Sequence, residues 1–366
     1  MEHPENDDLY KGVKVNKGVA DVPTVNPYLK KRIQRKEYTP AEFVEGILKG
    51  NITILSQAVT LVESSKYEHQ QIAQEIIEKC LPHAGKSVRI GITGVPGAGK
   101  STSIDAFGMH LIGEGRKLAV LAIDPSSERS KGSILGDKTR MEALSREKNA
   151  FIRPSPSAGS LGGVARKTRE TIVLCEAAGF DTVFVETVGV GQSETAVHSM
   201  VDFFLLIQLA GTGDELQGIK RGIMEMADGI IINKADGDNL EKAKLAAAQF
   251  RNALHLFPAP ESGWFPKVLT YSGYYNIGIK EIWDMIGEYM KFTKENGYFN
   301  YKRNEQAKYW MYESINDTLR ETFYHNPAVE NMLVHTEQQV LNNEISSFVA
   351  AKRMMDLFLE NLPAKK

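Results

Sequence analysis

The chain contains 366 residues and has a formal net charge of −2; 42% of its residues are apolar and 25% are charged. This length suits one large domain with extensions or two domains of ordinary size. The average composition excludes a disordered chain, and the near-neutral charge gives no reason to expect a nucleic-acid partner.

The cysteines and the apolar runs indicate the compartment. Cys80 and Cys175 lie among apolar neighbours and are too few for a disulfide framework, so we predict reduced core thiols. The acidic N-terminus has the pattern of neither a signal peptide nor a transit helix. The most apolar run, residues 201–210, is too short to span a bilayer and contains Asp202 and Gln208. We therefore expect a soluble, cytoplasmic protein with no membrane partner.

The first part of the chain predicts an arm followed by helices. Residues 1–25 are polar and predict an extended arm. Thr39-Pro40-Ala41-Glu42 is a capping box with proline at the first helical position. Apolar periodicity predicts further helices over residues 52–64 and 67–80. We assign residues 1–86 to an N-terminal arm and helical extension.

From residue 87 to residue 296 the pattern alternates between strands and helices, with helices predicted over residues 103–111 and 164–178, among others. Such alternation specifies an α/β fold with a mainly parallel sheet and helices on both faces. Ligands are then expected at the carboxyl ends of the strands. The predicted strands are 88–93, 118–123, 151–153, 182–185, 203–207, 229–232 and 267–271.

The last part of the chain, residues 297–366, is predicted to be a helical extension, with a wholly helical pattern from Asn304. Its apolar residues recur at helical spacing, so this surface must pack on the main domain or on another copy of the chain. The first such stripe contains Trp310, Met311, Ile315, Leu319 and Phe323.

A glycine-rich loop follows the first predicted strand and precedes a helix. It fits the phosphate-loop pattern G-x-x-x-x-G-K-[ST] at every fixed position. Lys100 would place a positive charge near the β- and γ-phosphates, and the Ser101 hydroxyl would ligate Mg²⁺. The strand and the helix around the loop favour this interpretation over an ordinary glycine turn. The predicted nucleotide-binding residues are Gly94, Val95, Pro96, Gly97, Ala98, Gly99, Lys100, Ser101 and Thr102.

A second motif, Asn233-Lys234-Ala235-Asp236, ends the strand at 229–232 and matches the guanine-reading N-K-x-D element of G proteins. The Asp236 carboxylate would accept hydrogen bonds from guanine N1–H and the 2-amino group, whereas adenine offers neither donor. Lys234 would lay its stem along the base. Ser272-Gly273 is placed to offer a main-chain N–H to guanine O6, although Ser-Gly also ends strands as a plain turn.

Carboxylates at or near strand ends predict a Mg²⁺ site, because this ion prefers hard oxygen ligands. The predicted ligands are Ser101, Asp124, Asp137 and Glu186; alternatively, Glu186 forms a helix cap or a salt bridge, and Asp137 is an ordinary loop residue. Gln192 is a candidate to orient the attacking water, which makes Lys100, Glu186 and Gln192 the predicted catalytic residues.

The glycine-rich loop at residues 211–221 contains four charged side chains and has no evident role in holding nucleotide. It follows the strand at 203–207 and is either a solvated turn or a segment that transmits the nucleotide state to a partner. The predicted partner-coupling residues are Asp214, Gln217 and Lys220.

Together these motifs resemble the G proteins associated with methylmalonyl-CoA mutase, the bacterial MeaB-type proteins once labelled arginine-transport ATPases. The segments that carry the resemblance are 94–102, 124–127, 132–141, 186–194, 213–220 and 233–236.

The resemblance implies a P-loop GTPase that uses GTP, GDP and Mg²⁺, with slow basal hydrolysis stimulated by a partner. It implies that Asp124, Asp137 and Glu186 are the Mg²⁺ and switch carboxylates, and that residues 213–220 form a third switch loop facing the mutase. It further implies a homodimer joined through the C-terminal helices. The implied role is a chaperone that gates delivery of adenosylcobalamin to an acyl-CoA mutase and releases damaged cofactor.

Three other functions remain open. A metal-insertion GTPase usually shows a Cys/His ligand cluster, and this sequence has none. A P-loop kinase, as the old transport label supposed, needs an acceptor pocket and gains nothing from reading guanine. A non-catalytic scaffold would use nucleotide only for stability.

Overall fold

The computed structural model describes residues 38–123, 141–154, 161–187, 193–210 and 221–361. Compactness divides the chain into residues 1–39 and residues 40–366, and the second unit is described below. Its helices are α1 (Pro40–Leu48), α2 (Ile52–Glu63), α3 (Tyr67–Cys80), α4 (Lys100–Gly113), α6 (Leu161–Ala177), α7 (Ser193–His198), α8 (Arg221–Met226), α9 (Leu240–Leu254), α10 (Ile279–Glu295), α11 (Tyr298–Tyr324), α12 (Pro327–Leu341) and α13 (Ser347–Glu360). Its strands are β1 (Val88–Gly94), β2 (Leu118–Ile123), β3 (Ala150–Arg153), β4 (Thr182–Thr187), β5 (Phe203–Leu209), β6 (Gly229–Asn233) and β7 (Lys267–Thr270).

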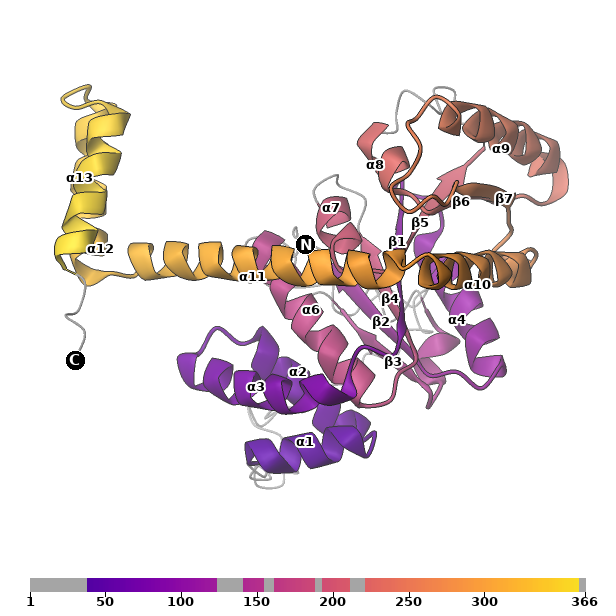
Figure 1. Cartoon of the computed structure of the whole chain (residues 1–366), viewed down its shortest axis with the longest axis horizontal. Coiled ribbons are helices and arrows are strands. Elements are labelled where there is room, and N and C mark those ends of the chain that lie inside the picture. Colours follow the sequence, from indigo (N-terminus) through magenta and orange to yellow (C-terminus); the bar gives the residue numbers. More distant parts are fainter. Residues whose placement is uncertain (1–37, 124–140, 155–160, 188–192, 211–220, 362–366) are drawn as a thin grey trace, which may run out of the picture. The chain divides into compact units, whose positions relative to one another are not determined.

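The strands form one seven-stranded sheet in the order β3-β2-β4-β1-β5-β6-β7, and every pairing is parallel (Figure 1). The central strands are buried along nearly their whole length, which explains their continuous apolar sequences. Because all strands run the same way, the carboxyl ends of β1, β4, β5 and β6 meet at one edge. The predicted α/β class is therefore confirmed.

Helices cover both faces of the sheet. On one face α4 and α10 pack against alternate residues of the central strands, such as Ile90 and Leu205. On the other face α9 packs against Leu206 and Ile232. Alternate residues of β5 and β6 thus supply two separate cores, as the two-residue period of a strand requires.

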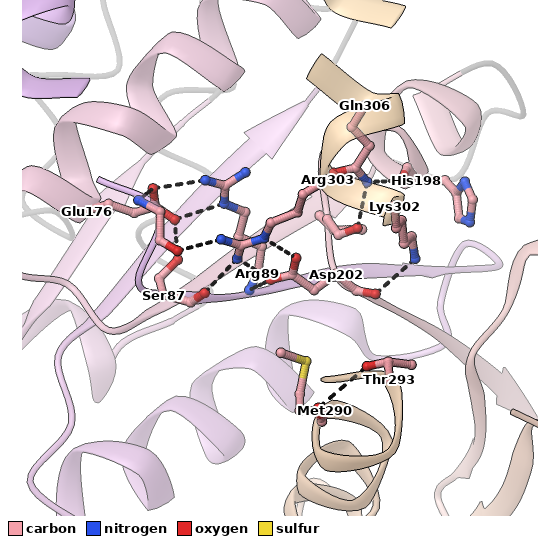
Figure 2. Close-up of polar contacts among 12 residues, drawn as sticks. Ser87, Arg89, Glu176, His198, Asp202, Met290, Thr293, Lys302, Arg303 and Gln306 are labelled. Carbon is pink, nitrogen blue, oxygen red and sulfur yellow. Dashed lines mark hydrogen bonds and ion pairs between the residues drawn. The ribbon is translucent and has the colours of Figure 1, made fainter. Parts of the chain in front are cut away.

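Helix α11 is attached to the sheet by buried polar contacts (Figure 2). The Arg303 guanidinium donates to both carboxylate oxygens of Asp202, at 2.8 and 2.7 Å. The Arg89 guanidinium pairs with Glu176 at 2.8 and 2.9 Å. Burial raises the pKa of Glu176, but the hydrogen bonds and charge of Arg89 outweigh burial and hold that pKa below its usual value.

Residues just after α7 are held by the same helix. Gln306 donates to the carbonyl oxygen of Val201 at 2.9 Å, and the Trp310 indole N–H donates to that of Ser199 at 3.0 Å. Trp310 is buried, so the predicted apolar stripe packs on the main unit at this end. The helix begins at Tyr298, ahead of the predicted helical pattern from Asn304.

The next three residues of the stripe, Met311, Ile315 and Leu319, are 52%, 46% and 60% exposed, whereas Phe323 is partly buried against α12 and α13. The next helices, α12 and α13, pack against each other around Val329, and Phe358 joins this cluster. Part of the predicted C-terminal apolar surface is therefore not covered by the described residues of the chain.

Cys80 and Cys175 are both buried and free, as predicted, and burial raises the pKa of the Cys80 thiol to about 11. Within the described ranges, no helix combines the length and apolar character needed to cross a bilayer.

Candidate functional site

The glycine-rich loop connects β1 to α4 at the carboxyl edge of the sheet. Gly99 has a φ of 86°, the left-handed region that glycine adopts without strain. Gly94 lies so close to β5 that an added Cβ would be 2.2 Å from the carbonyl oxygen of Ile207. Helix α4 begins at Lys100, so its first N–H groups face the loop, as an anion site requires. The Lys100 ammonium donates to the carbonyl oxygen of Gly94 at 2.9 Å.

Asn233 ties the base-reading element to the phosphate loop. Its side-chain N–H₂ donates to the carbonyl oxygen of Ala98 at 2.8 Å, across 135 positions of sequence. Its Oδ1 accepts from the main-chain N–H of Lys234 at 2.7 Å. Lys234 has a φ of 59°, an unusual conformation for a non-glycine residue that often marks functional sites. The structure therefore brings together the two motifs that the sequence predicts to bind one nucleotide.

Asp236 is held by the loop that follows β7. The Ser272 hydroxyl donates to the Asp236 carboxylate at 2.5 Å, which orients the acceptor predicted to read guanine. The N–H groups of Ser272 and Gly273 were predicted to face guanine O6. In this structure they donate to the carbonyl oxygen of Ile277 at 3.0 Å and to Asn233 Oδ1 at 3.2 Å, respectively.

Ser101 and Glu186 meet beneath the phosphate loop. The Ser101 hydroxyl donates to the Glu186 carboxylate at 3.3 Å, and Glu186 is buried at the end of β4. A hydroxyl and a carboxylate are the oxygen donors that Mg²⁺ prefers, so this pair fits the predicted ion. The described ranges contain no group of three His, Cys, Asp or Glu side chains arranged to hold a metal.

Several predicted site residues lie outside the described residues, so the structure gives no geometry for them. They are Asp124, Asp137, Gln192, Asp214, Gln217 and Lys220.

One contact at this edge involves residues that the sequence motifs did not indicate. The Thr187 hydroxyl donates to the Thr93 hydroxyl at 2.9 Å, joining the end of β4 to β1. Both threonines are buried, and the sequence signal for them would have been a hydroxyl residue next to each predicted functional segment. The pair adds a side-chain contact between the strand before the phosphate loop and the residue after Glu186.

Comparison with known proteins identifies the family. Residues 55–328 match the family model "Methylmalonyl Co-A mutase-associated GTPase MeaB". The chain is 44% identical to the GTPase ArgK of Escherichia coli over 320 residues, covering 87% of this chain and 97% of that protein. It is also 44% identical to the mouse protein named methylmalonic aciduria type A homolog, mitochondrial, over 323 residues, covering 86% of this chain and 78% of that protein.

A solved structure agrees with this assignment. The crystal structure titled LAO/AO transport system kinase superposes with a TM-score of 0.69 at 38% identity, covering 88% of this chain and 99% of that one. Since the family model spans most of the sequence and the relatives align along most of their length, this chain belongs to the MeaB family of methylmalonyl-CoA mutase-associated GTPases.

Proposed function

We propose that this GTPase is a G-protein chaperone of an adenosylcobalamin-dependent acyl-CoA mutase. In this proposal GTP binding and hydrolysis gate the loading of the cofactor and the release of damaged cofactor. The proposal that both motifs bind one guanine nucleotide is supported by the Asn233–Ala98 hydrogen bond, which connects the N-K-x-D motif to the phosphate loop. The mutase part rests on the family to which the chain belongs.

Within the site, each residue has a proposed task. Lys100 would neutralise charge on the β- and γ-phosphates during transfer to water. Ser101 and Glu186 would hold Mg²⁺, together with Asp124 and Asp137. When bound, the ion would offset negative charge on the phosphate oxygens. Gln192 would orient the attacking water, and the basal rate would be slow without a partner.

Nucleotide choice tests the base-reading assignment. Asp236→Asn replaces an acceptor-only carboxylate with an amide that can donate, so it should favour xanthine nucleotides, which carry an oxygen at C2. Calorimetric titration should show GDP affinity falling while XDP affinity rises. Adenine leaves both hydrogen bonds to the Asp236 carboxylate unmade, so the preference of wild type for GDP over ADP should be about 100-fold or more. Equal affinity for GDP and ADP would refute the assignment.

Coupling to the mutase is the second test. We propose that the loop at residues 213–220 transmits the nucleotide state to the mutase. Asp214→Ala and Lys220→Ala should leave GTP affinity and basal hydrolysis nearly unchanged while abolishing stimulation by the mutase. Phosphate release should be measured for each variant alone and with purified mutase. Loss of GTP binding would place the loop in the nucleotide site, and normal stimulation would make it a solvated turn.

We also propose that the protein is a cytoplasmic homodimer joined through its C-terminal helices. Exposed apolar side chains continue along these helices, including Leu341 at 71% and Phe348 at 86% exposure. A cavity of about 630 Å³ lies among them, lined by Phe323, Leu333 and Met355. Contiguous apolar surface of this kind is typical of protein–protein interfaces, and a second copy supplies a matching surface.

A further inference from the structure

The loop that follows β7 is pinned at its base next to the site. Ser272 and Ile277 exchange two main-chain hydrogen bonds, each 3.0 Å long. Between them Asn276 adopts a left-handed φ of 56°, which lets the chain turn back. The Ser272 hydroxyl also holds Asp236, so the pinned loop and the base-reading carboxylate form one unit. The residue at the centre of this loop, Tyr274, is therefore held beside the base-reading element.

The Tyr274 side chain faces open space beside α4. It is 80% exposed, and it lines a cavity of about 700 Å³ together with Gly273 and Thr102. Thr102 belongs to the first turn of α4, directly after the phosphate loop. The cavity thus lies between α4, which follows the phosphate loop, and the loop that holds Asp236.

The main-chain N–H groups of this loop also single out Tyr274 as a possible ligand contact. The N–H groups of Ser272 and Gly273 are already bonded within the protein, and that of Tyr275 faces the Ser272 hydroxyl at 3.4 Å. In the described part of the chain, the N–H of Tyr274 has no partner. At Tyr274 the loop therefore still offers a ligand both a donor and an aromatic face.

We propose that Tyr274 contacts the purine base and that its ring forms one wall of the base pocket. This inference rests on the proposed guanine-nucleotide site and adds a residue to it. Stacking on an aromatic face tolerates any base, because every base has a π-face. Tyr274 would therefore supply affinity for the base, whereas Asp236 supplies the choice of guanine.

This division of roles can be measured with the full chain by calorimetry. The probes are GDP, IDP, which lacks the 2-amino group, and inorganic tripolyphosphate, which lacks a base. Tyr274→Ala should lower the affinity for GDP and the affinity for IDP by the same factor, about 5- to 150-fold. Its affinity for tripolyphosphate should stay at the wild-type value, and Tyr274→Phe should bind all three probes like wild type.

The neighbouring Tyr275 provides a matched control. It is 60% exposed and its ring lies 4.9 Å from that of Tyr274, but it does not line the cavity. Tyr275→Ala should therefore leave GDP affinity unchanged.

The remaining outcomes are decisive. If wild type fails to bind GDP, the proposed function itself is wrong. If wild type binds GDP and Tyr274→Ala binds it equally well, only the role of Tyr274 is overturned. A loss of tripolyphosphate affinity equal to the loss of GDP affinity would also overturn it, because the ring would then support the loop and not the base.

Discussion

The ion pair between Arg303 and Asp202 is predicted to control the attachment of α11 to the sheet. The Asp202 side chain is only 2% exposed, and that of Arg303 is 15% exposed. The same guanidinium also donates to the carbonyl oxygens of Gly85 and Ser87. Replacing Arg303 with methionine keeps most of the side-chain volume but removes every one of these donors.

The free-energy cost of Arg303→Met arises because the Asp202 carboxylate stays buried without its partner. Without Arg303, the Asp202 carboxylate still accepts a hydrogen bond from the main-chain N–H of Arg89 at 2.9 Å. Removing one partner of a buried ion pair typically costs about 3–5 kcal/mol, because the other charge is left uncompensated. This corresponds to a rise in local opening of roughly 140- to 4,000-fold.

Hydrogen–deuterium exchange is the suitable assay, since it reports local opening even when a large chain does not unfold in one step. Amide exchange in the first turns of α11 should accelerate by that factor in Arg303→Met. The control is Lys308→Met, which removes the exposed pair with Glu305 on the same helix and should leave exchange unchanged. Adding Asp202→Asn to Arg303→Met should restore part of the protection, because a neutral amide costs less to bury. Equal exchange in Arg303→Met and Lys308→Met would refute the reasoning.

Three further predictions concern acidity, catalysis and assembly. Burial and the charge of Lys302 lower the pKa of His198 from 6.5 to about 3. Between these pH values the folded state therefore binds fewer protons than the unfolded state. The free energy of unfolding should then decrease as the pH falls through this window. At pH 5 the loss should be about 2 kcal/mol, and His198→Phe should flatten this part of a pH series of urea unfolding curves. Lys100→Ala should abolish GTP hydrolysis in a phosphate-release assay, and normal turnover would remove Lys100 from the catalytic residues. Met355→Asp places a charge in the cavity of α13 and should give monomers in sedimentation velocity, whereas Lys352→Glu on the exposed side of the same helix should not.

The local elements could be predicted from the sequence because their signals lie within short segments. The phosphate loop is a run of consecutive residues whose glycines and lysine have few other uses. Most of the predicted strand limits agree with the structure to within two residues, because buried parallel strands are continuous apolar runs bounded by polar residues. The capping box also marks the start of α1 correctly, at Pro40.

The contacts that assemble the site depend on the tertiary structure. Strand–helix alternation implies a parallel sheet but leaves the order of its strands open, so the closeness of Asn233 and Ala98 follows only once β5 separates β1 from β6. Likewise, Arg303 reaches Asp202 across 101 positions, and periodicity along one helix carries no information about such a partner. The sequence by itself predicted which residues would bind phosphate and guanine, because each motif is local. Only the tertiary structure decided that the two motifs lie in contact, because long-range contacts depend on how the strands pair.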